Sequence, residues 1–177
     1  MSKKIILPKD IDKLEKLSVK EEVLISGTLY TARDQAHKRI VKKLKKGEEL
    51  PFNIQKNCIF YAGPSPKNPK TGAVAIGPTT SYRMDNYTPY LLSKGLRCVI
   101  GKGKRSEKVI RSFKKNKSTY LITVGGIAAY LSSKIINIEK FDFRDLGPEA
   151  VYKIEVKDFP SIVAVDSCGN DIYKMGG

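Results

Sequence analysis

The sequence is poor in the residues that most often hold metal ions or clusters. Its 177 residues include one histidine and three cysteines, and tryptophan is absent. Cys58, Cys98 and Cys168 lie far apart, and none belongs to a CxxC-type pair. Structural zinc sites and iron-sulfur clusters need thiolates at short, regular spacings. We therefore expect this chain to hold no metal by itself, with Cys58 and Cys98 buried in strands and Cys168 in a turn.

Long apolar runs are also missing. No segment of the sequence approaches the roughly 18 apolar residues that a membrane-spanning helix needs. The opening residues, MSKKIILPKD, have neither the apolar core nor the small-residue cleavage site of a signal peptide. The sequence thus predicts a cytoplasmic protein without a membrane partner.

Negative charge is scarce relative to positive charge. There are 18 Asp plus Glu against 33 Lys plus Arg, which gives a formal net charge of +15 at pH 7. Such an excess attracts nucleic acid, an acidic protein or a small anionic substrate. Nucleic acid fits least, because aromatic residues make up only 8% and no RNP-like, zinc-finger or KH-type motif is present. We predict no nucleic-acid partner, and a non-catalytic anion- or nucleic-acid-binding module remains an alternative.

Strand and helix patterns alternate along the chain. Apolar runs predict strands at residues 4–8, 21–30, 57–63, 73–77, 96–101, 119–126, 135–143, 150–159 and 161–166. Apolar residues at helical spacing predict helices at residues 9–17, 32–46, 89–95, 106–116 and 127–135. The chain is too short for two ordinary domains. These patterns predict one α/β domain over residues 1–177 with a strand-rich C-terminal third.

A dense group of charges lies where a predicted strand leads into a helix, in the segment GTLYTARDQAHKRIVKK. Thr31 and Asp34 stand in a T-x-x-D arrangement that predicts a capping box, in which the hydroxyl caps the Asp34 amide and the carboxylate returns to the Thr31 amide. Arg33 and His37 lie on one face of the first helical turns, where free amides favour an anion. The alternative is structural: Arg33 pairs with a nearby acid and His37 is a satisfied structural group.

Two further cationic segments follow predicted strands. GPTTSYRMD supplies three consecutive hydroxyls and Arg83, whose forked guanidinium suits a carboxylate. GKGKRS places Lys102 between two glycines that let the backbone approach a ligand. Each also has a plainer interpretation, the first as a turn-forming loop and the second as a flexible turn before a helix. Neither contains the phosphate-loop motif.

All three cationic segments follow the carboxyl end of an apolar strand. In open α/β sheets, ligand crevices form at that edge. We therefore predict that Arg33, Arg83 and Lys102, with Thr79 or Thr80, meet around one small anion of several charges. Two or three cations suit a dicarboxylate.

Four segments together resemble the β subunit, or C-terminal region, of the class I fumarate hydratase and L(+)-tartrate dehydratase family: SGTLYTARDQAHKR, GPTTSYRMD, GKGKRS and VGGIAAYL. The resemblance extends from about Glu22 to near Tyr173. It implies a swivelling β/β/α domain that forms half of an iron-sulfur hydro-lyase interconverting (S)-malate and fumarate. It also implies an α subunit, in a hetero-oligomer such as α2β2, that holds the 4Fe-4S cluster through its own cysteines.

The resemblance assigns roles by position. The residues that match carboxylate-binding residues of the family are Arg33, Arg83 and Lys102, and Thr79 matches the residue proposed as the base. The supporting residues within the same motifs are Asp34, His37 and Thr80.

Tyr82 departs from the family pattern, in which this position is usually Gly or another small residue. A tyrosine there narrows or re-lines the pocket. Tartrate or a methyl-substituted fumarate therefore stays open as the substrate beside malate and fumarate. A further alternative is a subunit that tethers an active α partner and has no catalytic residues of its own.

Overall fold

The computed structural model describes residues 1–123 and 128–176. The strands in these ranges are β1 Lys3–Leu7, β2 Glu22–Thr31, β3 Cys58–Phe60, β4 Ala62–Pro64, β5 Ile76–Pro78, β6 Cys98–Gly101, β7 Thr119–Thr123, β8 Ile135–Asp142 and β9 Val151–Val165. The α-helices are α1 Asp34–Lys45, α2 Thr88–Ser93, α3 Glu107–Lys115 and α4 Ala128–Ser132. Short 3₁₀ segments are η1 Ile11–Lys16, η2 Ile54–Lys56, η3 Ser81–Met84, η4 Arg144–Glu149 and η5 Ile172–Lys174.

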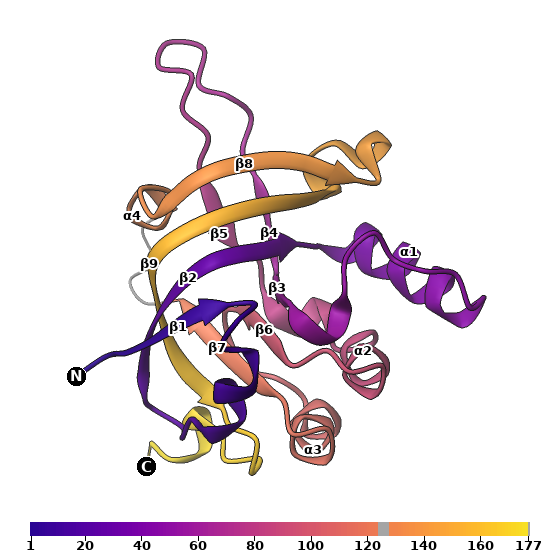
Figure 1. Ribbon diagram of the computed structural model, residues 1–177, viewed down its shortest axis with the longest axis vertical. Helices are drawn as coiled ribbons and strands as arrows, with labels where there is room; N and C mark the ends of the chain where they lie inside the picture. The colour runs from indigo at the N-terminus through magenta and orange to yellow at the C-terminus, as the bar shows by residue number, and fades with distance from the viewer. Residues whose placement is uncertain (124–127, 177) are drawn as a thin grey trace.

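A closed ring of five strands forms the centre of the molecule (Figure 1). Strands β2, β3, β6 and β7 run parallel in this order, and β9 closes the ring by pairing antiparallel with both β7 and β2. Strand β1 extends the sheet alongside β2, and β8 extends it alongside β9. The expected α/β class is confirmed, but the sheet is a mixed barrel rather than an open sheet.

Strands β3 and β6 of the barrel are apolar because both of their faces are covered. Phe60 and Ile100 belong to one hydrophobic core, whereas their neighbours Ile59 and Val99 belong to a second core. Successive side chains of a strand point to opposite faces of the sheet, so a strand buried on both faces has no polar position. This explains the uninterrupted apolar runs CIF and CVI, which appear in the sequence without any alternation.

Three helices pack on one side of the barrel (Figure 1). Their inward side chains build the second core: Ala36 and Ile40 of α1, Leu91 and Leu92 of α2, and Val109, Ile110 and Phe113 of α3. The opposite faces carry the basic residues, as the helical spacing predicts. Gly47 follows the C-cap residue Lys46 of α1 with a φ of +74°, the left-handed conformation that favours glycine at the C′ position.

Several predicted elements differ in extent or type. The predicted strand 57–63 divides into β3 and β4, because β4 leaves the barrel to pair with the short β5. The predicted strands 150–159 and 161–166 are one 15-residue strand, β9. The break near Pro160 is a bulge instead: Asp158 has a φ of +50°, and two residues of β9 oppose Ser26 of β2. The predicted helix 9–17 is the 3₁₀ segment η1.

The loop between β4 and β5 is exposed and projects from the body of the molecule (Figure 1). Helix α4 is shorter than the predicted helix 127–135. Residues 124–127, the VGGI half of the VGGIAAYL motif, lie outside the described residues. In the described part of the chain, no helix combines the length and apolar character needed to cross a bilayer.

Candidate functional site

The three cationic segments meet at the rim of the barrel where its parallel strands end. Strand β2 leads through Arg33 into α1, and β6 ends directly before Lys102. The segment with Thr79 and Arg83 arrives by another route, because it follows β5, which lies outside the barrel sheet. A parallel β-bridge between Thr80 and Lys102 then joins this segment to the end of β6. The expected route, directly from the end of a strand of the main sheet, therefore holds for the segments of Arg33 and Lys102. The segment with Thr79 and Arg83 reaches the rim from β5 instead.

The predicted capping box of Thr31 and Asp34 is wrong. Arg33 takes the N-cap position of α1 without a side-chain capping hydrogen bond. Thr31 is still part of β2, where its ladder with β9 lets Oγ1 accept the N–H of Tyr152 at 3.1 Å. Asp34 instead lies 2.8 Å from Arg83 Nη2, without the alignment of a hydrogen bond. This ion pair connects the first turn of α1 to the segment after β5.

The Arg33 side chain passes close to Gly63. A Cβ placed on Gly63 would lie 3.0 Å from Arg33 Cδ and would overlap the carbonyl oxygen of Pro148. Arg33 Nε is buried and has no hydrogen-bond partner among the described residues. A guanidinium has five N–H donors and no acceptor, so an unpaired donor near the rim is suited to an anionic oxygen.

His37 is fully buried and does not face an anion site. Its Nδ1 lies 2.9 Å from the Arg33 carbonyl oxygen, and its ring packs edge-on against Tyr61 at 5.2 Å between centroids. Burial lowers the pKa of His37 to about 4, although the bond to the Arg33 carbonyl acts in the opposite direction. The imidazole is therefore neutral at neutral pH and donates from Nδ1. The structural interpretation fits Nδ1, whereas Nε2 is buried without a hydrogen-bond partner among the described residues, so His37 is only partly satisfied.

In the segment after β5, the candidate site residues are at least partly accessible, whereas Ser81 between them is buried. Thr79 is half-buried, and its N–H donates to the Tyr61 carbonyl at 2.7 Å. Tyr82 is 64% exposed, and the side chain of Arg83 beside it is 51% exposed. Ser81 is buried. Tyr82 therefore lines the outer surface next to Arg83 rather than the core.

Lys102 is held through its backbone. The Ser81 N–H donates to the Lys102 carbonyl at 3.0 Å, and the Lys102 N–H donates to Ser81 Oγ at 2.9 Å. A Cβ on Gly101 would overlap Ser81 Oγ, so this glycine permits close approach between two loops rather than to a ligand. The Lys102 side chain is exposed and forms no ion pair within residues 1–123 and 128–176.

Three buried polar residues beneath the rim were not singled out from the sequence: Ser81, Asp85 and Arg105. All three belong to the segments GPTTSYRMD and GKGKRS. Arg105 is wholly buried and forms an ion pair with Asp85 at 2.6 Å. Their spacing does not distinguish them from the exposed Arg83 and Lys102. The two short segments contain more polar residues than are needed to bind a ligand. This excess was the only sign in the sequence that some of them are buried.

The three thiols do not form one cluster. Cys58 and Cys98 are partners in the β3–β6 ladder and fully buried, and Cys168 is exposed in the turn after β9, all as expected. Burial raises the pKa of the Cys58 thiol. In the ranges that the structure describes, no group of three or more His, Cys, Asp and Glu side chains could hold a metal ion. This donor set does not fit an iron-sulfur cluster.

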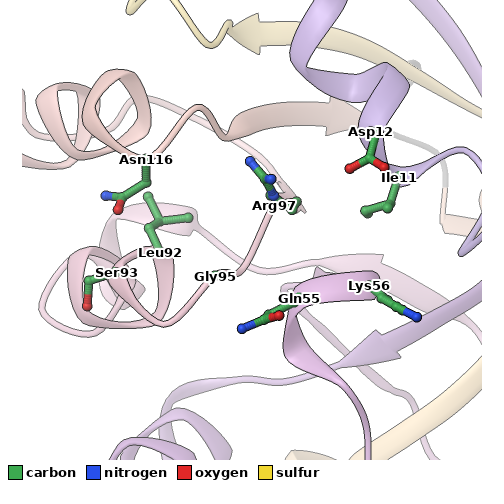
Figure 2. Close-up of a pocket in the computed structure, with 9 residues that line it drawn as sticks. All are labelled: Ile11, Asp12, Gln55, Lys56, Leu92, Ser93, Gly95, Arg97 and Asn116. Carbon is green, nitrogen blue, oxygen red and sulfur yellow. The ribbon is translucent and has the colours of Figure 1, made fainter.

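A groove of about 470 Å³ lies at the opposite end of the barrel strands (Figure 2). Its lining residues are Ile11, Asp12, Gln55, Lys56, Leu92, Ser93, Gly95, Arg97 and Asn116. Gln55 and Lys56 precede β3, and Gly95 and Arg97 precede β6. Because Lys102 follows β6, the groove and the cationic rim are separate features.

Similarity to known proteins covers almost the whole chain. The family model described as Fumarase C-terminus matches residues 2–176. A protein of Methanocaldococcus jannaschii, provisionally named L(+)-tartrate dehydratase subunit beta, is 40% identical over 91% of this chain and 86% of that protein. Fumarate hydratase 2 of Leishmania major is 40% identical over 97% of this chain and 31% of its own length. The aerobic class I fumarate hydratase of Escherichia coli K12 is 37% identical over 92% of this chain and 30% of its own length. The chain thus spans about a third of the length of these two fumarate hydratases.

Proposed function

This chain belongs to the fumarase C-terminal family, and we propose that it is the β subunit of an iron-sulfur hydro-lyase that interconverts (S)-malate and fumarate. The family includes class I fumarate hydratases and a relative named for tartrate dehydration. Membership therefore supports the class of reaction, whereas malate as the substrate is the finer part of the proposal.

One observation carries the proposal: three cationic segments from distant parts of the chain meet at one rim. The ion pair between Arg83 and Asp34 joins the segment after β5 to α1, next to Arg33. The bridge between Thr80 and Lys102 joins the same segment to β6. A dicarboxylate carries two negative groups a few bonds apart, which suits several fixed cations better than one.

We assign the carboxylate contacts to Arg33, Arg83 and Lys102. The two guanidiniums offer forked donors that match carboxylate oxygens, and the ammonium supplies a point charge. Asp34 supports Arg83 through the ion pair, and His37 supports Arg33 through its backbone carbonyl. The ion pair orients the Arg83 guanidinium, and the bond from His37 holds the backbone that carries Arg33, before the substrate arrives.

Thr79 is the proposed base that removes the proton beside a malate carboxylate. A neutral hydroxyl is a poor base, and nearby cations favour its ionised form. Its backbone is tied to Tyr61, and its neighbour Thr80 is tied to Lys102. As the C–H bond breaks, negative charge builds on the neighbouring carboxylate, and the rim cations stabilise it. The C=C bond forms when the hydroxyl leaves the adjacent carbon, a departure that the cluster of the α subunit would assist as a Lewis acid.

The 4Fe-4S cluster is assigned to a separate α subunit, because the thiols of this chain do not fit it. The name of the M. jannaschii relative, a subunit beta, supports a partner of this kind. The proposal includes the swivelling of a β/β/α domain of residues 1–177 against that subunit, a hetero-oligomer of α2β2 type, and a cytoplasmic location.

The test is anaerobic reconstitution. The purified chain is mixed with a cluster-loaded α subunit from the same genome, and fumarate absorbance is followed with malate, tartrate and methyl-substituted substrates. We expect turnover only in the mixture, with malate preferred. A stable complex that turns over none of these substrates would remove the substrate assignment and the catalytic roles of Thr79, Arg83 and Lys102.

L(+)-tartrate dehydration is the second candidate. Two observations favour it: the M. jannaschii relative matches over most of its own length, and the exposed Tyr82 lies beside Arg83. A preference for tartrate that falls in a Tyr82→Gly variant would support this candidate. A preference for malate in the unmodified complex would exclude it.

A further inference from the structure

A buried ion pair joins the two loops of the proposed site beneath the rim. Arg105 is wholly buried, and its Nε lies 2.6 Å from Asp85 Oδ1. We infer that Arg105, together with Asp85, is a positioning residue that fixes the loop with Thr79 and Arg83 against the loop with Lys102. It acts without touching the substrate. This inference rests on the proposed function.

Asp85 connects the first loop to the second. It follows η3 directly, and its Oδ1 accepts the bond from Arg105 Nε. Its Oδ2 accepts the N–H of Ser106 at 2.8 Å, and Ser106 is the N-cap of α3. Because both carboxylate oxygens are used, the end of the first loop cannot shift relative to the start of α3 without breaking a charged hydrogen bond.

Arg105 also reaches the other boundaries of the first loop. Its Nη2 lies 2.8 Å from Thr88 Oγ1 at the start of α2, and 3.3 Å from the Tyr61 hydroxyl. Tyr61 is the residue whose carbonyl accepts the Thr79 N–H. The Arg105 guanidinium therefore bonds to Thr88, at one end of the segment 79–88, and to Tyr61, which anchors the other end.

A second set of hydrogen bonds leads from this group to Lys102. The Tyr120 hydroxyl lies 2.8 Å from Ser81 Oγ and 2.9 Å from the Gly103 carbonyl oxygen. Ser81 Oγ in turn accepts the Lys102 N–H. The guanidinium carbon of Arg105 lies 4.9 Å from the centre of the Tyr120 ring. Tyr120, which bonds to Ser81 and to Gly103 next to Lys102, thus packs directly on Arg105.

Stability alone does not explain a charged pair at this place. The guanidinium is surrounded by the rings of Tyr61, Phe113 and Tyr120, an environment that apolar side chains would also fill. Replacement of a buried ion pair by apolar residues is often neutral, because desolvation offsets the attraction. An apolar pair has no preferred orientation, whereas the bond from Arg105 Nε to Asp85 Oδ1 and the bond from Nη2 to Thr88 Oγ1 fix the orientation of the guanidinium. Direction matters at a site where a displacement of about 1 Å costs about 100-fold in rate.

The test uses variants of the full chain assembled with the α subunit. Arg105→Lys keeps the charge and loses the fork, and the double variant Arg105→Met with Asp85→Leu removes both charges. Arg39→Lys is the matched control, because Arg39 makes two hydrogen bonds to Asp145 at the exposed surface. We expect kcat/KM to fall about 10- to 100-fold in the first two variants. The double variant should keep a Tm close to that of the wild type, and Arg39→Lys should keep its activity.

Amide hydrogen exchange of the same full-length variants gives a readout that does not depend on turnover. We expect the Ser81 and Lys102 amides to exchange about tenfold faster in both Arg105 variants, because their local structure opens more readily. The amides of the β1–β2 ladder should be unchanged.

The outcomes are distinguishable. Wild-type kcat/KM in the double variant would overturn the inference, and so would unchanged exchange at Lys102, whatever the activity. If the wild-type complex turns over no substrate, the proposed function fails, and the exchange rates alone decide whether Arg105 positions the two loops. If Arg105→Lys does not fold, the double variant supplies both measurements.

Discussion

At the scale of single residues, the orientation of Arg33 depends on a residue far from it in the sequence. Gly63 leaves room between Arg33 Cδ and the carbonyl oxygen of Pro148. Arg33 Nε has no hydrogen-bond partner among the described residues, and Asp34, the next residue in the chain, pairs with Arg83. The ion pair therefore ties the Arg83 guanidinium to the helix turn that directly follows Arg33.

The Thr79 hydroxyl is the group with the most specific proposed role. Thr79→Val keeps the β-branched shape and the backbone bond to Tyr61 and removes only the hydroxyl. We expect turnover to be lost by at least about 100-fold, as for removal of a general base. Binding of the dicarboxylate, measured by titration calorimetry on the complex, should stay near that of the wild type. Turnover close to normal would remove Thr79 from the mechanism.

The buried His37 predicts a dependence of stability on pH. Its pKa is about 4 in the folded protein and 6.5 ordinarily, so between these values the unfolded chain binds a proton that the folded chain does not. Stability that is present above the ordinary pKa is therefore lost as the pH falls toward about 4, by roughly 3 kcal/mol.

The measurement is denaturant unfolding of the wild type and of His37→Gln across this pH range. The loss between the two pH limits should be smaller in the variant, since glutamine does not titrate. Carboxylates titrate in both proteins, so the comparison isolates His37. Equal slopes in the two proteins would contradict the prediction.

At the scale of elements, the rim depends on the close approach of a 3₁₀ turn to the end of a barrel strand. Segment η3 is joined to the chain after β6 through Ser81 and Lys102. This contact is possible because Gly101 has no side chain. Met84 of η3 and Val99 of β6 belong to the same hydrophobic core, and the hydrogen bonds and the glycine define how the two elements meet at the rim.

Gly101→Ala tests this join. The added methyl would overlap Ser81 Oγ, and we expect a loss of about 1–3 kcal/mol in the free energy of unfolding, as for other overpacked sites. Because Ser81 holds Lys102, kcat/KM should fall together with Tm. Val99→Ala, a truncation two positions earlier in β6, is the control that lowers Tm and leaves kcat/KM unchanged. Gly101→Ala with wild-type kinetics would show that the join does not matter for the site.

At the scale of the whole molecule, the closed barrel brings the carboxyl ends of β2, β3 and β6 to one rim. The rest of the positive charge is distributed over surface positions of helices, strands and loops, where single lysines are strongly hydrated. A subunit whose only task is to tether a partner needs no cations gathered at the rim. The catalytic and tethering hypotheses therefore differ in what the rim cations do.

Arg83→Ala and Lys102→Ala separate these hypotheses. We expect each to lower kcat/KM about 100- to 1000-fold, the usual loss when one stabilising donor is removed. Assembly with the α subunit, followed by gel filtration, should be intact. Lys38→Ala, on the exposed face of α1, is the control that changes neither. Loss of assembly with unchanged kinetics would favour the tether.

Local pattern was sufficient for much of the fold and for part of the site. Helix α1 and its glycine stop follow from apolar spacing and from Gly47, and the buried thiols follow from strand-like surroundings. The capping box failed because Thr31 is held in the β2–β9 ladder, a long-range contact that overrides the local motif. The continuity of β9 was missed because a bulge can absorb Asp158 without ending the strand.

The sequence by itself determined which residue types are present at the ends of the strands: an arginine after β2, hydroxyls and an arginine after β5, and a lysine between glycines after β6. Only the tertiary structure decided how they meet, through the β4–β5 ribbon, the bridge to Lys102 and the buried Arg105. The physical reason is that charge and backbone flexibility are properties of single residues. Burial, pairing and close approach instead depend on segments that are distant in the chain and become neighbours only when the barrel closes.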